Sequence, residues 1–170
     1  MTTPATATAP AEISLTGIRK TFRTRKGTVT ALDDFTLQVS GGEFVAILGP
    51  SGCGKSTALR MAAGLDVPDA GAVTVDSGSP AELGGAGKLG VAFQDNALLP
   101  WLSVRKNIAL PYKATGTAVD RARVDALIDL VGLSSFADAR PGRLSGGMRQ
   151  RVSIARSLVL SPRVLLLDEP

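Results

Sequence analysis

The feature that most constrains the fold is a glycine-rich octapeptide between an apolar run and a helix-like segment. Residues 49–56 read Gly-Pro-Ser-Gly-Cys-Gly-Lys-Ser and fit the pattern G-x-x-x-x-G-K-[ST]. The apolar run at 44–48 predicts a strand that is buried on both faces, as in a parallel sheet. Residues 56–63 predict a helix that ends at Gly64. This order predicts an α/β fold with a ligand site at the carboxyl end of the strand.

The glycine-rich loop has the composition of a phosphate cradle. Glycines let the backbone curl so that several N–H groups point at one anion, and the following helix adds the positive end of its dipole. We expect Lys55 to contact the β- and γ-phosphates of a nucleotide, Ser56 to ligate Mg²⁺ and Thr57 to hold a phosphate oxygen. Cys53 is interpreted as a tolerated small residue with a free side chain, because no base lies beside it. The predicted nucleotide-binding residues of this loop are Gly49, Ser51, Gly52, Cys53, Gly54, Lys55, Ser56 and Thr57.

Two adjacent carboxylates follow a second apolar run. Residues 164–167 predict another buried strand, which delivers Asp168 and Glu169 to its carboxyl end. Asp168 is placed to hold Mg²⁺ through water, and Glu169 to polarise an attacking water. Such a pair can merely cap a turn, but next to a phosphate-binding loop it indicates hydrolytic chemistry.

A third segment, at 144–151, resembles a helix start with unusual glycines. Ser145 is a good N-cap, and Gly146 and Gly147 expose backbone N–H groups at the first helical turn. The segment is therefore either a second anion-binding helix terminus or an ordinary helix cap.

The rest of the pattern predicts an alternation of short strands and helices. Residues 1–12 are rich in Thr, Ala and Pro and predict a disordered tail. Two strands, at 13–15 and 36–39, are expected around a turn that contains Gly27. The remaining elements expected are strands at 73–75 and 89–93 and helices at 120–131 and 148–160, with buried faces at Val124, Leu127, Ile128, Val131 and Val152, Ala155, Val159.

Composition excludes several classes of site and partner. The chain has no histidine and one cysteine, which excludes Ser-His-Asp and Cys-His catalysis, histidine-ligated zinc and internal disulfides. Five Phe, one Trp and one Tyr are too few for an aromatic base-stacking surface. The net charge is +4, and most of the charged residues are scattered along the chain. The one dense run of basic residues is interpreted as a solvated hairpin loop rather than a binding patch. That run consists of Arg19, Lys20, Arg23, Arg25 and Lys26.

Together these motifs resemble the ATP-binding subunit of ABC transporters, and the likeness extends from about Ile13 to the end of the chain. Residues 144–147, Leu-Ser-Gly-Gly, match the ABC signature, which few other P-loop proteins carry. By this resemblance Gln94 is the Q-loop glutamine, which reaches toward Mg²⁺ and the attacking water. Phe22 falls where the family places an aromatic ring on adenine; the alternative is a core aromatic.

The resemblance implies a fold and a set of functional residues. We expect an α/β P-loop NTPase core with an antiparallel β subdomain and a helical subdomain at about 96–160. Residues 13–170 would form a partial ABC domain, incomplete at its C-terminus. The implied cofactors are ATP and Mg²⁺. The implied catalytic residues are Glu169 and Gln94, the metal-binding residues are Ser56, Gln94 and Asp168, and the signature contacts are Ser145, Gly146 and Gly147.

The resemblance also implies partners. Two such subunits pair head to tail, with ATP between the P-loop of one and the Ser145–Gly147 segment of the other. They act on transmembrane permease subunits at the cytoplasmic face of the membrane, with a solute-binding protein involved indirectly and no nucleic acid.

One segment suggests a subtype of importer. Residues 93–101, which end in Leu-Leu-Pro-Trp, resemble the importers for nitrate, sulfonate or taurine. Leu98, Leu99 and Trp101 would be apolar anchors for the coupling helix of the permease, or they pack within the helical subdomain.

Two departures from the family pattern bear on activity. Met148 stands where the family most often has Gln, which is not interpreted as inactivating because Met also occurs there in the sulfonate-like group. The chain also stops before the family's interface loop and switch histidine, so we expect the 170-residue chain to fold poorly or to turn over ATP slowly. Two alternatives stay open: a non-transport ABC ATPase that acts on ribosomes or DNA, and a nucleotide-binding fragment without catalysis.

Overall fold

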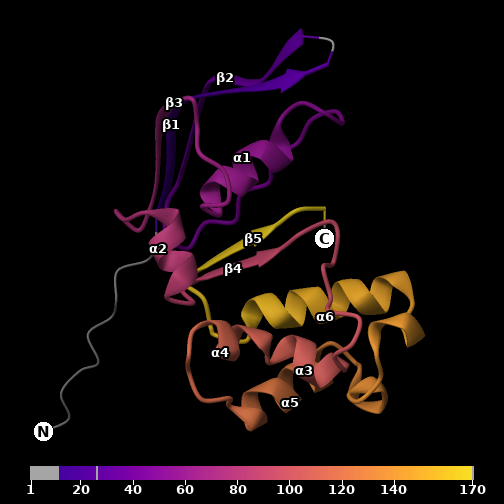
Figure 1. The fold of residues 1–170 in the computed structure, drawn as a ribbon. Coiled ribbons are helices and arrows are strands. Elements are labelled where there is room, and N and C mark those ends of the chain that lie inside the picture. The colour runs from indigo at the N-terminus through magenta and orange to yellow at the C-terminus, as the bar shows by residue number, and fades with distance from the viewer. Residues whose placement is uncertain (1–11, 26, 170) are drawn as a thin grey trace, which may run out of the picture. The chain divides into compact units, whose positions relative to one another are not determined.

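The computed structural model describes residues 12–25 and 27–169 (Figure 1). The chain divides into two compact units, one ending at Pro80 and one beginning at Ala81. Of the expected disordered tail at 1–12, residues 1–11 lie outside the described residues. None of the helices that the structure describes combines the length and apolar character needed to cross a bilayer.

The first unit is an antiparallel sheet with one helix. Strands β1 (Ile13–Thr24), β2 (Gly27–Val39) and β3 (Ala70–Val75) are ordered β2-β1-β3. This confirms the three strands expected here, and the first two are longer than the sequence pattern suggested. Helix α1 (Lys55–Ala62) confirms the helix after the glycine-rich loop. The buried apolar side chains of this unit come from both the helix and the strands and include Leu15, Ile18, Leu32, Ala58, Met61 and Val75.

The expected buried strand at 44–48 is wrong. The segment has no strand structure, and Phe44 and Leu48 are 91% and 90% exposed. A buried strand needs a hydrogen-bonding partner along its edges and apolar cover on its faces. In the described part of the chain, the two sheets pair only β1, β2 and β3 in one and β4 and β5 in the other. The run therefore lacks the partners that its composition suits.

The second unit combines a parallel strand pair with helices. Strands β4 (Leu89–Ala92) and β5 (Val164–Leu167) pair in parallel, with Leu89 opposite Val164 and Ala92 opposite Leu167. Both strands were expected. Helix α2 (Pro80–Gly85) begins at the boundary between the units. The other helical segments are α3 (Val104–Ile108), α4 (Leu110–Ala114), α5 (Arg121–Leu130), η1 (Ser134–Phe136), η2 (Pro141–Arg143) and α6 (Gly146–Leu158).

The core of the second unit lies among its helices. The expected apolar faces of α5 and α6 are both buried, with Val131 only partly covered beyond the end of α5. Capping defines where these helices begin, because the Asp120 side chain accepts a hydrogen bond from Arg123 N. Helices α2, α3 and α4 were not expected, because five or six residues are too few to show helical periodicity.

Candidate functional site

The glycine-rich loop in the first unit is an exposed turn that leads directly into α1. Gly52 and Gly54 have φ values of 82° and 97°, which side chains rarely tolerate. Gly54 is the N-cap of α1, no side chain caps it, and the first turn contains no acidic residue. The N-terminal N–H groups of α1 are thus not covered by a carboxylate, which suits an anion.

Lys55 folds back over this loop. Its ammonium donates to the carbonyl oxygens of Gly49 at 2.8 Å and Pro50 at 2.9 Å. Ser56 is exposed and Thr57 is half-buried in the first turn of the helix. A bound phosphate would replace the two neutral acceptors of Lys55 with charged ones, which make stronger hydrogen bonds.

The thiol of Cys53 lies within the loop, close to Lys55 and Gly49. Its Sγ is 3.8 Å from Lys55 Nζ, and a Cβ at Gly49 would lie 2.8 Å from it. Cys53 is a free, exposed cysteine, as expected, and its thiol also contacts the Lys55 ammonium. A residue larger than glycine at position 49 would therefore require the Cys53 side chain to move.

Gly54 makes the closest approach between the loop and the sheet. A Cβ there would lie 2.4 Å from Ala31 O and 2.8 Å from Leu32 Cδ2, both on β2. We expect Gly54→Ala to lower the free energy of unfolding by about 2–4 kcal/mol, from left-handed strain plus a backbone clash. Gly52→Ala is the matched control, because a Cβ at Gly52 meets nothing within 4 Å and only the strain of about 1–2 kcal/mol remains. Urea unfolding of both variants checks this, and equal losses would contradict it.

The second unit brings Gln94, Asp168 and Glu169 together. Because β4 and β5 are parallel and in register, the residues that follow them meet at one edge, and Asp168 N donates to Ala92 O at 2.9 Å. Gln94 Nε2 donates to Glu169 Oε2 at 2.5 Å. Glu169 has a φ of 46°, so its backbone holds a left-handed turn directly after the strand. These two side chains are the pair expected to act in catalysis.

Arg156 on α6 supports the segment after Gln94, and sequence reasoning missed it. Its guanidinium donates to Asn96 O and Ala97 O, each at 2.9 Å. Burial lowers the pKa of Arg156 from its usual value. A signal was present, because position 156 lies four residues after Val152 and three before Val159, on the apolar stripe of the helix. A charged residue on such a stripe needs partners.

The signature segment begins α6. Ser145 Oγ accepts from Met148 N at 3.2 Å, which confirms the helix cap. Gly146 and Gly147 are exposed, and a Cβ on either would meet nothing within 4 Å. Ser145 precedes Arg156 by a helical rise of roughly 16 Å. Arg156, whose side chain contacts the segment after Gln94, therefore lies near the opposite end of α6 from Ser145.

Phe22 lies on the sheet of the first unit, and the alternative of a core aromatic is wrong. It is 40% exposed on β1, opposite Val29 of β2. Lys20 Nζ lies 5.6 Å from the centroid of its ring. The same ammonium bonds Asp66 Oδ1 at 2.8 Å, so Lys20 is not part of a solvated loop as the sequence suggested. Arg19, Arg23 and Arg25 are exposed, and Lys26 lies outside the described residues.

The Lys20–Asp66 pair predicts an acid-sensitive contribution to stability. The hydrogen bond from Lys20 lowers the pKa of Asp66 from its usual 3.8, against the opposing effect of burial. The pKa of Asp66 is lower in the folded protein than in the unfolded chain. The ion pair therefore stabilises the fold fully at pH values above the unfolded pKa, and this stabilisation is lost as the pH falls through the folded pKa. We expect Asp66→Asn to cost about 1 kcal/mol near neutral pH and progressively less below about pH 4.

Unfolding free energies from pH 7 down to the acid limit of the folded state check this prediction. Asp33→Asn is the control, because the Arg19–Asp33 ion pair has side chains that are 58% and 71% exposed. A loss in Asp66→Asn that stays constant with pH would contradict the prediction.

The backbone around the Leu98–Trp101 segment is fixed by hydrogen bonds to the buried side-chain amide of Asn107. Asn107 is fully buried; its Oδ1 accepts from Leu99 N at 2.8 Å, and its Nδ2 donates to Leu99 O, Leu102 O and Ser103 O. Leu98 packs against the helical core, as the packing alternative expected, whereas Trp101 is 66% exposed. The segment thus presents one large aromatic side chain on a fixed backbone.

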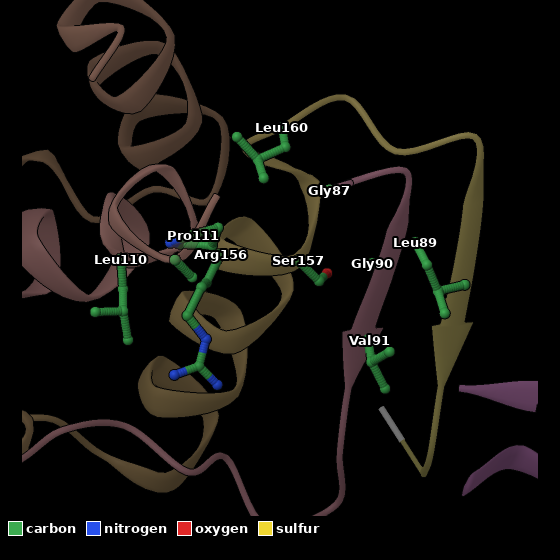
Figure 2. Close-up of a pocket in the computed structure, with 10 residues that line it drawn as sticks. Gly87, Leu89, Gly90, Val91, Leu110, Pro111, Arg156, Ser157 and Leu160 are labelled. Atoms are coloured by element: carbon green, nitrogen blue, oxygen red, sulfur yellow. The ribbon is translucent and has the colours of Figure 1, made fainter. Parts of the chain in front are cut away.

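A cavity of about 270 Å³ lies between β4, α4 and α6 (Figure 2). Most of its lining is apolar, and Arg156 and Ser157 provide the polar atoms. Gly90 faces α6 closely, since a Cβ there would lie 2.3 Å from Ser157 O.

Among the described residues no group of three or more Cys, Asp or Glu side chains gathers to hold a metal.

Comparisons with known proteins agree with this geometry. The family model described as "ABC transporter" matches residues 32–170. The bicarbonate transport ATP-binding protein CmpC of Synechocystis is 48% identical over 93% of this chain and 24% of its own. The nitrate import ATP-binding protein NrtD of Synechococcus elongatus is 46% identical over 90% of this chain and 57% of its own. The taurine import ATP-binding protein TauB of Burkholderia pseudomallei is 46% identical over 88% of this chain and 57% of its own.

A solved structure shows the same fold. The dimeric post-hydrolysis state of the ATP-binding cassette MJ0796, bound to ADP and Pi, matches with a TM-score of 0.86 and 35% identity, over 93% of this chain and 74% of that one. This confirms the expected α/β nucleotide-binding fold. The chain spans about a quarter to just under three fifths of the length of the curated relatives it matches.

Proposed function

We propose, from the premise that this chain belongs to the ABC transporter family, that its protein binds and hydrolyses ATP to drive an importer. The observation that carries the proposal is the exposed glycine-rich loop, in which Lys55 stands at the uncapped start of α1. This arrangement binds the β- and γ-phosphates of a nucleotide.

Each predicted site residue then has a chemical task. Backbone N–H groups of the loop and the Lys55 ammonium would bind the phosphates. Ser56 and Gln94 would hold Mg²⁺ through oxygen atoms and Asp168 would hold it through water, and the metal would supply charge neutralisation for the phosphates. Glu169 polarises the attacking water as a general base, and Gln94 orients its carboxylate through the 2.5 Å hydrogen bond.

The signature segment is proposed to act on the nucleotide of a second subunit. Gly146 and Gly147 are exposed and leave their backbone open to a ligand. The N-terminus of α6 would then stabilise the γ-phosphate held by the partner's loop. Two solved cassette structures that are described as dimeric support the pairing of two subunits.

The transport partners are proposed from the exposed aromatic and from the relatives. Trp101, with Leu98 and Leu99 on the backbone fixed by Asn107, would anchor the coupling helix of a permease at the cytoplasmic face of the membrane. Relatives named for nitrate, bicarbonate and taurine favour a small oxyanion-bearing solute, delivered by a solute-binding protein.

The test of this function separates ATP binding from nucleic-acid binding. The full chain is titrated with ATP with and without Mg²⁺, and its retention on RNA and DNA is followed over a salt series. We expect saturable, Mg²⁺-dependent ATP binding and negligible retention on nucleic acid at physiological salt. Retention that survives that salt would favour the ABC ATPases that act on ribosomes or DNA.

A further inference from the structure

We propose that Lys20 is a positioning residue for the nucleobase, an inference that rests on the proposed ATP-binding function. Lys20 and Phe22 lie two residues apart on β1, so their side chains share one face of the sheet. Lys20 Nζ lies 5.6 Å from the ring centroid, within the range of a cation–π contact. The ammonium takes one face of the ring and leaves a partly exposed aromatic surface for a ligand.

Lys20 is itself fixed in place. Its Nζ donates to Asp66 Oδ1 at 2.8 Å and to Val67 O at 2.6 Å, and it lies 3.8 Å from Asp69 Oδ1. The Lys20 side chain is only 13% exposed. Asp69 is anchored in turn, because it accepts at 2.7 Å from both the N–H and the hydroxyl of Thr21. The cation is thus a rigid support for the ring.

The same part of the sheet touches the phosphate loop. Lys20 is paired with Leu32 and Phe22 with Val29 across β1 and β2. At the start of α1, Gly54 packs against the carbonyl of Ala31 and the side chain of Leu32. The short stretch 29–32 therefore runs from the aromatic ring to the last glycine of the loop, a rise of roughly 10 Å. A purine nucleoside triphosphate with its phosphates in the loop would extend its base toward Phe22.

This arrangement predicts that Lys20 affects the binding of the nucleobase, although Lys20 does not contact the phosphates. A ring held in one orientation loses less conformational freedom when a base stacks on it. Lys20 should then affect the affinity for ATP but not the affinity for inorganic tripolyphosphate, which has no base. A general loss of structure in the first unit would weaken both ligands together.

The experiment titrates the full chain with ATP and with tripolyphosphate in the presence of Mg²⁺. We expect Lys20→Met to weaken ATP about five- to tenfold, in line with a partly desolvated cation–π contact, and to leave tripolyphosphate unchanged. Lys20→Arg should restore ATP affinity to within about twofold, because guanidinium also stacks on rings. Lys113→Met, an exposed lysine of α4, is the control for the same change of net charge. Asp66→Asn keeps the cation but loosens its anchor, and should give a smaller loss in the same direction.

A double variant tests whether Lys20 acts through the ring. In the Phe22→Ala background, Lys20→Met should have no further effect on ATP. Equal losses for ATP and tripolyphosphate, or a Lys20 effect that persists without Phe22, would overturn the inference. If the ratio of the affinities for ATP and tripolyphosphate is the same in Phe22→Ala as in the unaltered protein, the assignment of Phe22 to the nucleobase is wrong as well. An ATP affinity that Lys55→Ala leaves unchanged would instead overturn the proposed function itself.

Discussion

Replacing Lys55 with alanine is expected to weaken ATP binding about a hundredfold. The ammonium already makes two short hydrogen bonds to loop carbonyls, at 2.8 and 2.9 Å, which shows that it is held directly over the loop. In the complex these would become charge-assisted bonds to phosphate, and losing one such bond costs about 1.5–3 kcal/mol. Two bonds together correspond to a loss of about a hundredfold or more.

Equilibrium dialysis of Mg²⁺-ATP against the variant checks this prediction. Lys113→Ala removes a lysine of the same charge from the exposed surface of α4 and should leave ATP affinity unchanged. A urea titration of both variants shows whether the loop lysine also stabilises the fold. Similar ATP affinities for the two folded variants would contradict the assignment of Lys55.

Replacing Glu169 with glutamine is expected to lower ATP turnover by about a hundredfold to ten-thousandfold, the usual range for loss of a general base. ATP affinity should change by less than about threefold, because glutamine has the same shape and its amide oxygen still accepts from Gln94. The separation of turnover from binding is the diagnostic result.

Single-turnover phosphate release, measured beside equilibrium binding, checks this second prediction. Glu82→Gln, an exposed position on α2, is the matched control for the same chemical change. Turnover in Glu169→Gln close to that of the unaltered protein would contradict the general-base role. Loss of ATP binding in that variant would mean that Glu169 contributes to ATP binding rather than to the polarisation of the attacking water.

The sequence predicted those parts of the fold that depend on local signals. Ser145 caps α6 as its residue type suggests, and the apolar spacing of α5 and α6 gave the correct buried faces. Gly52 and Gly54 adopt positive φ values because the loop turns too tightly for other residues. The roles of Gln94 and Glu169 were expected from the family resemblance and from the Asp-Glu pair, whereas their hydrogen bond depends on the parallel pairing of β4 with β5, which the structure supplies.

The misses depend on contacts that a local pattern does not encode. The run at 44–48 has the composition of a buried strand, but composition specifies an environment and not the strands that provide it. The Lys20–Asp66 hydrogen bond joins residues 46 positions apart, so a basic run suggested a solvated loop instead. The position of Arg156 on the apolar stripe of α6 indicated that it needs partners, but the partners themselves lie some sixty residues earlier in the chain and could not be predicted.

The most direct test of the central claim, that a nucleotide binds in the loop at 49–56, uses Cys53. It is the single cysteine of the chain, it is exposed, and its Sγ lies 3.8 Å from Lys55 Nζ. The measurement is the rate of Cys53 alkylation by iodoacetamide, followed by mass spectrometry with Mg²⁺-ATP, with adenosine and without ligand. We expect saturating ATP to slow alkylation about tenfold or more, because phosphates would cover the thiol and hold Lys55 above it, whereas adenosine should give no protection. Alkylation at the same rate with and without ATP, in protein shown to bind ATP, would contradict the claim.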